Sequence, residues 1–187
     1  METAITIQVS KAIDASPLTG LPGNTRIQEE IKKAILEHDE YAIIYFDMDN
    51  FKAYNDAYGF QNGDLMIKNL AGCIQEAAGS ERFVGHIGGD DFVMITYDYE
   101  IQEICAIIIQ RFTQTIQSLY NEEDWERGFI ISRNRSGFVD KFPIATISIA
   151  ALSNKNRKFN SVETFSKELA GAKKAAKHIK GNSVICI

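Results

Sequence analysis

The chain has 187 residues, of which 45% are hydrophobic and 24% are charged, and its formal net charge is −5. This size and composition predict one soluble globular domain with a sizeable core. The negative charge argues against nucleic acid or an anionic membrane as the main partner. No apolar run approaches the length of a membrane span, and the first residues lack a signal-peptide pattern, so we expect no membrane segment in this chain.

Cysteine usage indicates the redox environment. Cys73, Cys105 and Cys186 lie far apart in the sequence and are odd in number. This pattern predicts buried free thiols in a reducing compartment rather than a disulfide framework or a metal site. We therefore expect a cytoplasmic protein.

The beginning of the chain divides at a turn. Residues 3–15 have a weak helical pattern, and the turn-rich segment 16–24 ends it. We predict an N-terminal helix over residues 1–15 and one domain over residues 16–187.

A helix and a buried strand are predicted next. Residues 25–38 carry apolar side chains at helical spacing, and Asn24 or Thr25 can cap that helix. The run from Tyr41 to Phe46 is apolar without a break. Such a run predicts a central strand that is buried on both faces.

Acidic residues stand at two predicted strand ends. Asp47 follows the central strand, and the tetrad Gly88-Gly89-Asp90-Asp91 lies between two apolar runs that predict a hairpin. Adjacent carboxylates repel each other unless a cation lies between them. Oxygen ligands without nearby His or Cys suit Mg²⁺ or Mn²⁺, and magnesium usually completes its shell with substrate phosphates. The alternative, for either segment alone, is a turn or strand end that is acidic because it is exposed.

The remaining elements follow from periodicity and turn residues. Residues 50–58 predict a short helix closed by Gly59, and Gly63-Asp64 opens a longer helix with Leu65 on its apolar side. We expect the side chains of Phe51, Tyr54 and Leu65 to pack in the core. The later predictions are a helix over 101–119, a solvated acidic loop over 121–124, strands over 129–132 and 142–150, a helix from its cap Ser161 to about residue 180, and an edge strand over 183–187.

Strands that alternate with helices but are joined partly by hairpins predict an α+β sandwich with a mixed, largely antiparallel sheet. A phosphorelay receiver also clusters acids. It needs a mostly parallel sheet and acids near the N-terminus, so the hairpin tetrad fits it badly.

Several motifs together resemble those of GGDEF domains, the catalytic domains of diguanylate cyclases. The tetrad resembles the family signature, and the segment Asp47-Met48-Asp49-Asn50-Phe51-Lys52-Ala53-Tyr54-Asn55-Asp56 resembles the motif Asp-x-Asp-x-Phe-Lys-x-x-Asn-Asp. Leu18-Thr19-Gly20-Leu21-Pro22 resembles the entry motif, and Gly59 and Gly63-Asp64 follow at the family spacing. The resemblance implies a nucleotidyl-cyclase or polymerase-palm fold, with helices around a central sheet.

The resemblance also assigns roles to individual residues. Asp47 and Asp90 would bind Mg²⁺ or Mn²⁺ through their carboxylates, and Met48 through its carbonyl. Asp91 would assist metal binding or deprotonation of the attacking hydroxyl, whereas Asp49 would brace the turn. The substrate would be held by the backbone at Phe51, Lys52, Gly88 and Gly89, by Asn55 and Asp64 as guanine readers, and by Lys177 at the triphosphate.

Three of these side chains have a plainer interpretation from sequence. Asn55 is then a helix-end amide, Asp64 a helix N-cap, and Lys177 one of several lysines on a solvated helix face. Arg133 and Arg135, in the turn at 133–137, are likewise expected to be solvated.

Two departures from the family pattern concern the proposed active site, and two more concern a second site. Asp91 stands where the signature usually has Glu, and Gly181 stands where an arginine usually binds phosphate, with Lys180 beside it as a possible point-charge substitute. Gly79 and Arg82 occupy the positions of an inhibitory product site, and neither suits that role. We therefore expect no feedback inhibition through that site.

Two functions remain open at this point. The first is a diguanylate cyclase that condenses two GTP molecules into cyclic di-GMP and releases pyrophosphate. It would work as a homodimer and be attached to an upstream sensor or receiver domain in a bacterial signalling protein. The second is a weak or inactive GGDEF module that binds GTP or cyclic di-GMP and signals by association.

Overall fold

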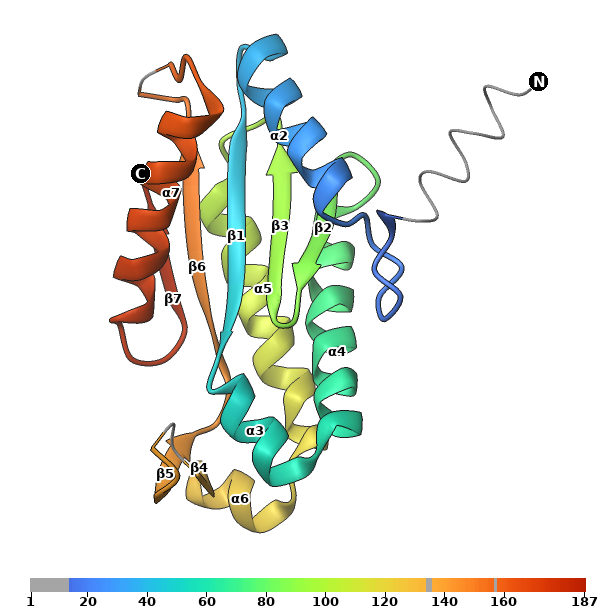
Figure 1. The fold of residues 1–187 in the computed structure, drawn as a ribbon, viewed down its shortest axis with the longest axis vertical. Coiled ribbons are helices and arrows are strands. Elements are labelled where there is room, and N and C mark those ends of the chain that lie inside the picture. Colours follow the sequence, from blue (N-terminus) through green and yellow to red (C-terminus); the bar gives the residue numbers. More distant parts are fainter. Residues whose placement is uncertain (1–13, 134–135, 157) are drawn as a thin grey trace, which may run out of the picture.

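A computed structural model describes residues 14–133, 136–156 and 158–187. The N-terminal helix predicted over residues 1–15 lies outside the described residues except for its last two. A five-stranded sheet forms the centre of the molecule (Figure 1). In spatial order its strands are β2 (Phe83–Gly88), β3 (Asp91–Thr96), β1 (Ala42–Asp49), β6 (Thr146–Ser153) and β7 (Ser183–Cys186).

Neighbouring strands in this sheet are antiparallel except for β6 and β7, which are parallel. The helices around it are α2 (Asn24–Glu37), α3 (Phe51–Tyr58), α4 (Phe60–Ala78), α5 (Ile101–Thr115), a 3₁₀ turn over Ile116–Leu119, α6 (Glu122–Arg127) and α7 (Val162–Lys177). The predicted α+β class with a mostly antiparallel sheet is therefore confirmed. No helix among the described residues is long and apolar enough to cross a membrane.

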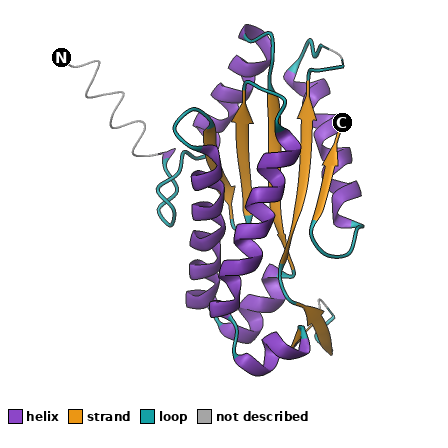
Figure 2. Cartoon of the chain, turned by 180° about the vertical axis from the view of Figure 1, so that it is seen from behind, coloured by secondary structure: helices purple, strands orange, loops and turns teal. Residues whose placement is uncertain are grey.

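Helices cover both faces of the sheet, α2 and α7 on one side and α4 and α5 on the other (Figures 1 and 2). The central strand β1 serves both cores because its side chains alternate between the faces. Phe46 and Met48 join the core with α4 and α5, whereas Ile43 joins the core with α2 and α7. Burial on both faces explains the unbroken apolar run, as predicted, and contributes about 1.5–3 kcal/mol for each large side chain.

The start of α2 is capped from outside the helix. The Asp14 carboxylate accepts hydrogen bonds from the backbone N–H groups of Thr25 at 3.0 Å and Arg26 at 2.9 Å. The N-cap residue is Gly23, and it has no side-chain hydrogen bond. The prediction that Asn24 or Thr25 caps this helix was therefore wrong, because a residue before the entry turn reaches the free N–H groups first.

Replacing Asp14 with Ala should destabilise the domain by about 1 kcal/mol, the usual value of a helix cap. The backbone hydrogen bonds from Arg26 and Thr25 hold the pKa of Asp14 below its usual value. The stabilisation is therefore complete above the unfolded pKa and disappears as pH falls through the lower folded pKa. Urea unfolding at pH 7 and pH 3 checks this expectation. Equal losses at both pH values would contradict the role of the charge.

Helix α4 begins earlier than predicted. It starts at Phe60, directly after Gly59, and not at Gly63-Asp64. Leu65 is 50% exposed, so its predicted core position was wrong, whereas Tyr54 is fully buried and Phe51 packs partly against the core. The buried side of α4 runs through Met66, Leu70 and Ile74 at a spacing of four residues, and Leu65 lies outside this stripe.

The segment predicted as a solvated acidic loop is the start of helix α6. The Asn121 side chain caps it by accepting a hydrogen bond from the Asp124 N–H at 2.7 Å. Asp124 itself is buried, and its carboxylate accepts hydrogen bonds from Tyr58 Oη and Arg127. Acids in the first turn of a helix are favoured by the helix dipole, so acidic composition did not mean a loop here.

The strand predicted over 142–150 is divided in two. Its first part belongs to β5 (Val139–Pro143), which pairs only with β4 (Phe129–Arg133) in a separate two-stranded ribbon. The main sheet resumes at Thr146 in β6. The ribbon lies at one end of the molecule beside α3 and α6 (Figure 1).

At the C-terminus, Ser161 caps α7 as predicted, with its Oγ accepting from the Thr164 N–H at 3.2 Å. The helix ends at Lys177 rather than near residue 180, and the edge strand β7 is confirmed. Cys73 and Cys105 are buried free thiols as expected, but Cys186 is exposed on that edge strand.

Candidate active site

The two acidic segments meet at one end of the sheet. Strands β1 and β3 are neighbours, and their register places Asp47 directly opposite Asp91. Asp90 lies in the turn between β2 and β3, beside Gly89, whose φ of 57° favours glycine. The structure thus brings together acids that are more than 40 positions apart in the sequence, as their placement at strand ends predicted.

His86 anchors the hairpin tip to the entry turn. Its Nε2 must donate to the Gly89 carbonyl, at 3.0 Å, because a carbonyl can only accept. In the neutral ring Nδ1 then accepts from the hydroxyls of Ser16 at 2.8 Å and Thr19 at 3.1 Å. The ring also stacks on Phe92 with centroids 4.4 Å apart. Sequence reasoning missed this residue, for which the only signal was a histidine inside an apolar strand before the glycine pair.

Burial and mutual repulsion disfavour ionisation of the carboxylates. Burial raises the pKa of Asp90 to about 6, and the charge of Asp47 adds to the effect. Burial also raises the pKa of Asp47, with the charge of Asp91 in the same direction and Lys177 opposing it. Two carboxylates in this state are a site that a cation would stabilise.

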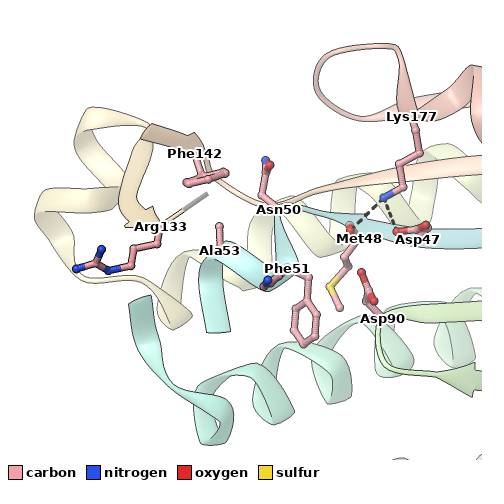
Figure 3. A pocket seen from close by; sticks show the side chains of 10 residues that line it. Asp47, Met48, Asn50, Phe51, Ala53, Asp90, Arg133, Phe142 and Lys177 are labelled. Carbon is pink, nitrogen blue, oxygen red and sulfur yellow. Dashed lines mark hydrogen bonds and ion pairs between the residues drawn. The ribbon is translucent and has the colours of Figure 1, made fainter. Parts of the chain in front are cut away.

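Lys177, from the last turn of α7, places its ammonium group among these acids (Figure 3). The Nζ donates to Asp47 Oδ1, to the Met48 carbonyl at 3.2 Å, and to Asp49 Oδ1 at 2.9 Å. Burial lowers its pKa, but the hydrogen bonds to Asp47 and Asp49 raise it more, so the ammonium stays charged. The interpretation of Lys177 as one more solvated lysine was therefore wrong.

Asp49 and Asp91 each have further partners at this end of the sheet. Asp49 accepts hydrogen bonds from Thr146 Oγ1 at 2.9 Å and Ser148 Oγ at 2.9 Å, which ties β1 to β6 and agrees with its expected bracing role. Asp91 pairs with Lys173 at 3.4 Å, and the Lys173 Nζ also lies 3.7 Å from the centroid of the Tyr45 ring. Asp91, the acid at the fourth position of the signature, thus has an ion-pair partner of its own on α7.

A cavity of about 450 Å³ opens beside these groups (Figure 3). The first turn of α3 forms one wall, and Asn50 before it adopts a left-handed φ of 63° that asparagine tolerates. Backbone N–H groups at the start of a helix favour anions. The lining residues are Asp47, Met48, Asn50, Phe51, Lys52, Ala53, Asp90, Arg133, Phe142 and Lys177.

The β4–β5 ribbon closes the other side of this cavity. Phe142 and Arg133 reach it from the ribbon, and the Asn50 side chain donates to the Pro143 carbonyl at 3.3 Å. The Arg133 guanidinium donates to the Gly137 carbonyl at 2.9 Å and points away from Asp47 (Figure 3). Sequence reasoning left Arg133 as a solvated loop residue and gave Phe142 no role, since only the folded ribbon brings them to the acids. Arg135 lies outside the described residues.

The donor set at the cavity fits a hard divalent cation. Asp47 and Asp90 supply carboxylate oxygens, and Met48 supplies a carbonyl oxygen from the same wall. Among the described residues no three His, Cys, Asp or Glu side chains group tightly enough to form a complete metal cage. Magnesium commonly uses one or two carboxylates and fills its remaining positions with water and phosphate oxygens, so this incomplete set is the kind that it prefers.

The two predicted guanine readers lie beside the α3–α4 turn. The Asn55 Oδ1 is buried without a hydrogen-bond partner, and it lies so close to Gly63 that a Cβ there would overlap it. Asp64 is the next residue, and its side chain is exposed. Because α4 begins at Phe60, Asp64 lies within the helix and is not the N-cap that the plainer interpretation assigned. An unpaired buried amide oxygen next to a free carboxylate leaves polar groups available for a ligand.

Replacing Gly63 with Ala should displace Asn55 and weaken nucleotide binding about tenfold, because a short side chain cannot move aside without moving its amide. The helix itself should tolerate alanine, which has the higher helix propensity. Calorimetric titration of GTP measures the effect. Gly72→Ala is the matched control, because a Cβ at that position of the same helix meets no atom within 4 Å. Unchanged GTP affinity in Gly63→Ala would contradict a role for Asn55.

The remaining site predictions can also be placed. Lys52 is exposed on α3, and Gly88 and Gly89 form the hairpin tip next to Asp90. Gly181 has a φ of 82°, a conformation that arginine would adopt only with strain. Arg82 donates to Thr96 Oγ1 at 3.1 Å and pairs with Asp98 at 2.7 Å, so it is engaged within the protein.

Comparison with known proteins identifies the family of this chain. The family described as "Diguanylate cyclase, GGDEF domain" matches residues 13–133. The bifunctional diguanylate cyclase/cyclic di-GMP phosphodiesterase MucR of Pseudomonas aeruginosa is 31% identical over 107 residues, which are 54% of this chain and 16% of that protein. Diguanylate cyclase DgcN of Escherichia coli is 33% identical over 103 residues, 51% of this chain and 25% of that protein. The chain therefore spans a quarter or less of the length of these two relatives.

Solved structures show the same fold. The coiled coil and GGDEF domain of DgcB from Caulobacter crescentus, in complex with c-di-GMP, aligns with a TM-score of 0.73 at 21% identity over 99% of this chain and 91% of that chain. Diguanylate cyclase SiaD from Pseudomonas aeruginosa, in complex with its activator SiaC, aligns with a TM-score of 0.65 at 18% identity over 100% of this chain and 66% of that chain. The predicted nucleotidyl-cyclase, palm-like fold is thus confirmed, and the chain belongs to the diguanylate cyclase GGDEF family.

Proposed function

We propose that this domain is a diguanylate cyclase, which joins two GTP molecules into cyclic di-GMP and releases pyrophosphate. The observation that carries the proposal is the meeting of Asp47, Met48, Asp90 and Lys177 with the first turn of α3 at one cavity. This set matches a nucleoside triphosphate, whose phosphates need both a metal site and positive charge.

In this proposal each residue has a defined task. The N–H groups at Phe51 and Lys52 bind phosphate oxygens, and Lys177 neutralises part of the triphosphate charge. The glycine tip at Gly88 and Gly89 lets the α-phosphate approach the turn. Asn55 and Asp64 bind the guanine edge, with the carboxylate accepting from the base N–H groups.

Asp47, Asp90 and the Met48 carbonyl would hold Mg²⁺ or Mn²⁺, which neutralises charge on the reacting phosphate. The 3′-hydroxyl of each GTP attacks the α-phosphorus of the other, and each of the two attacks forms one phosphodiester bond and breaks one bond to pyrophosphate. Asp91 accepts the proton of that hydroxyl. Each domain holds one GTP, so two copies must face each other as a homodimer.

Incubation of the purified chain with GTP and Mg²⁺ or Mn²⁺, followed by chromatography of the nucleotides, tests this function. We expect cyclic di-GMP and two pyrophosphates for each product molecule formed. GTP binding without any product would support the second function instead.

That second function, a GGDEF module that binds nucleotide without turnover, is favoured by two observations. Asp91 is paired with Lys173, which competes with any part it takes in proton transfer. Gly181, in the turn between α7 and β7, supplies no phosphate-binding fork. Attachment to an upstream sensor or receiver domain is part of either proposal.

A further inference from the structure

The contacts of Lys177 define a cation position in the protein itself. Its ammonium group donates to Asp47 and to the Met48 carbonyl, the same two groups that are proposed to bind the metal. The ammonium group also donates to Asp49, and Asp49 is itself held to β6 by a hydrogen bond from Thr146. The Lys177 side chain is 36% exposed, so it can leave this position without unfolding the helix.

An ammonium group held at these oxygens opposes the binding of a divalent cation to them. At contact distance the two positive charges repel, and the hydrogen bonds to Nζ occupy lone pairs of Asp47 Oδ1 and the Met48 carbonyl that a metal would use. A metal ion entering the free protein therefore binds more tightly once Lys177 has moved away. The displaced ammonium needs another anionic partner if its release is not to oppose metal binding.

We propose that Lys177 is an internal counter-ion that occupies the metal position of the nucleotide-free protein, and that the triphosphate draws it away. Metal and nucleotide then bind cooperatively, because the triphosphate draws Lys177 away from the metal position and the metal frees Lys177 to bind phosphate. The inference rests on the proposed function for the identity of the nucleotide, whereas the counter-ion role itself does not.

This arrangement gives two effects of opposite sign from one substitution. Without nucleotide, Lys177→Met removes the competing cation and should tighten Mn²⁺ binding about tenfold. With nucleotide, the same change removes a charge that binds phosphate, so the gain in Mn²⁺ affinity that nucleotide gives the wild type should be largely lost. A coupling of about tenfold is ordinary for two linked ligands.

The experiment measures Mn²⁺ affinity of the full chain by electron paramagnetic resonance of the free ion. Each protein is titrated alone and with 3′-deoxy-GTP, which lacks the attacking hydroxyl and cannot react. Lys177→Arg keeps a cation and should resemble the wild type without nucleotide. Lys174→Met is the matched control, because Lys174 is exposed on the same helix and its loss changes the net charge equally.

The proposal is supported if Lys177→Met alone binds Mn²⁺ more tightly without nucleotide and loses the nucleotide-linked gain. It is overturned if Lys177→Met binds Mn²⁺ no better than the wild type, or if Lys174→Met shows the same increase, since the effect would then be one of net charge. Circular dichroism of each variant confirms that α7 is folded. Failure of 3′-deoxy-GTP to bind the wild type would refute the proposed function and the nucleotide link, whereas the nucleotide-free titration would still decide the counter-ion role.

Discussion

Replacing Asp90 with Asn should lower the rate of cyclic di-GMP formation at least about 100-fold and weaken GTP binding in Mg²⁺. The substitution keeps the shape of the side chain but removes one of the two carboxylates proposed to bind the metal. Loss of one group that stabilises developing charge typically costs a factor of 10²–10³ in rate. Initial rates with saturating GTP, and calorimetric titrations with and without Mg²⁺, measure both effects.

The same variant should not be less stable than the wild type when metal is absent. The folded pKa of Asp90 is raised from 3.8 to about 6, so the charged carboxylate opposes folding at neutral pH. Stability of the wild type therefore falls as pH rises from about 4 to 6, and Asn avoids a penalty of up to about 3 kcal/mol above that window. Urea unfolding in EDTA at pH 4 and pH 7 tests this and separates lost activity from misfolding.

Glu103→Gln provides a control for Asp90→Asn, because Glu103 is an exposed acid on α5 outside the cavity. Its activity and Mg²⁺ dependence should equal those of the wild type. Full activity in Asp90→Asn would show that the metal assignment is wrong.

Replacing Asp64 with Ala should raise the dissociation constant for GTP about 10–100-fold and leave that for ATP nearly unchanged. A carboxylate accepts from the N1–H and N2–H₂ groups of guanine, a pattern that adenine does not offer. Hydrogen bonds to a charged group contribute about 1.5–3 kcal/mol, and a site built for such bonds rejects a base that lacks them. Asp64 forms no hydrogen bond or ion pair with another described residue, so its loss should hardly affect the fold.

Competition calorimetry with GTP and ATP measures the preference directly. Glu81→Ala removes the same charge from an exposed position before β2 and should keep the preference for GTP. If the wild type binds ATP as well as GTP, Asp64 and Asn55 are not base readers. A loss of both affinities in Asp64→Ala would instead indicate a general effect on the cavity.

Local patterns in the sequence determined the parts of the fold that depend on neighbouring residues. The unbroken apolar run of β1, the hairpin at Gly88-Gly89 and the helical stripe of α5 were predicted because each element must bury a continuous side of itself. Asp47 and Asp90 could be predicted as members of one candidate site for the same reason, since acids at the ends of neighbouring strands meet at one edge. The family motifs added Asn55 and Asp64 as proposed guanine readers, roles that spacing alone did not distinguish from a helix-end amide and a cap.

Tertiary structure alone decided which distant groups complete these elements. Asp14 caps α2 from across the entry turn, His86 ties the hairpin tip to Ser16, and the β4–β5 ribbon forms a wall of the cavity. Lys177 lies 130 positions from Asp47 in the sequence, and on its own helix it is one of several lysines at similar spacing. Only the docking of α7 against the sheet, through buried residues such as Leu169 and Ala176, selects this lysine to contact the acids. Such contacts depend on the packing of whole elements, which no local pattern of residues specifies.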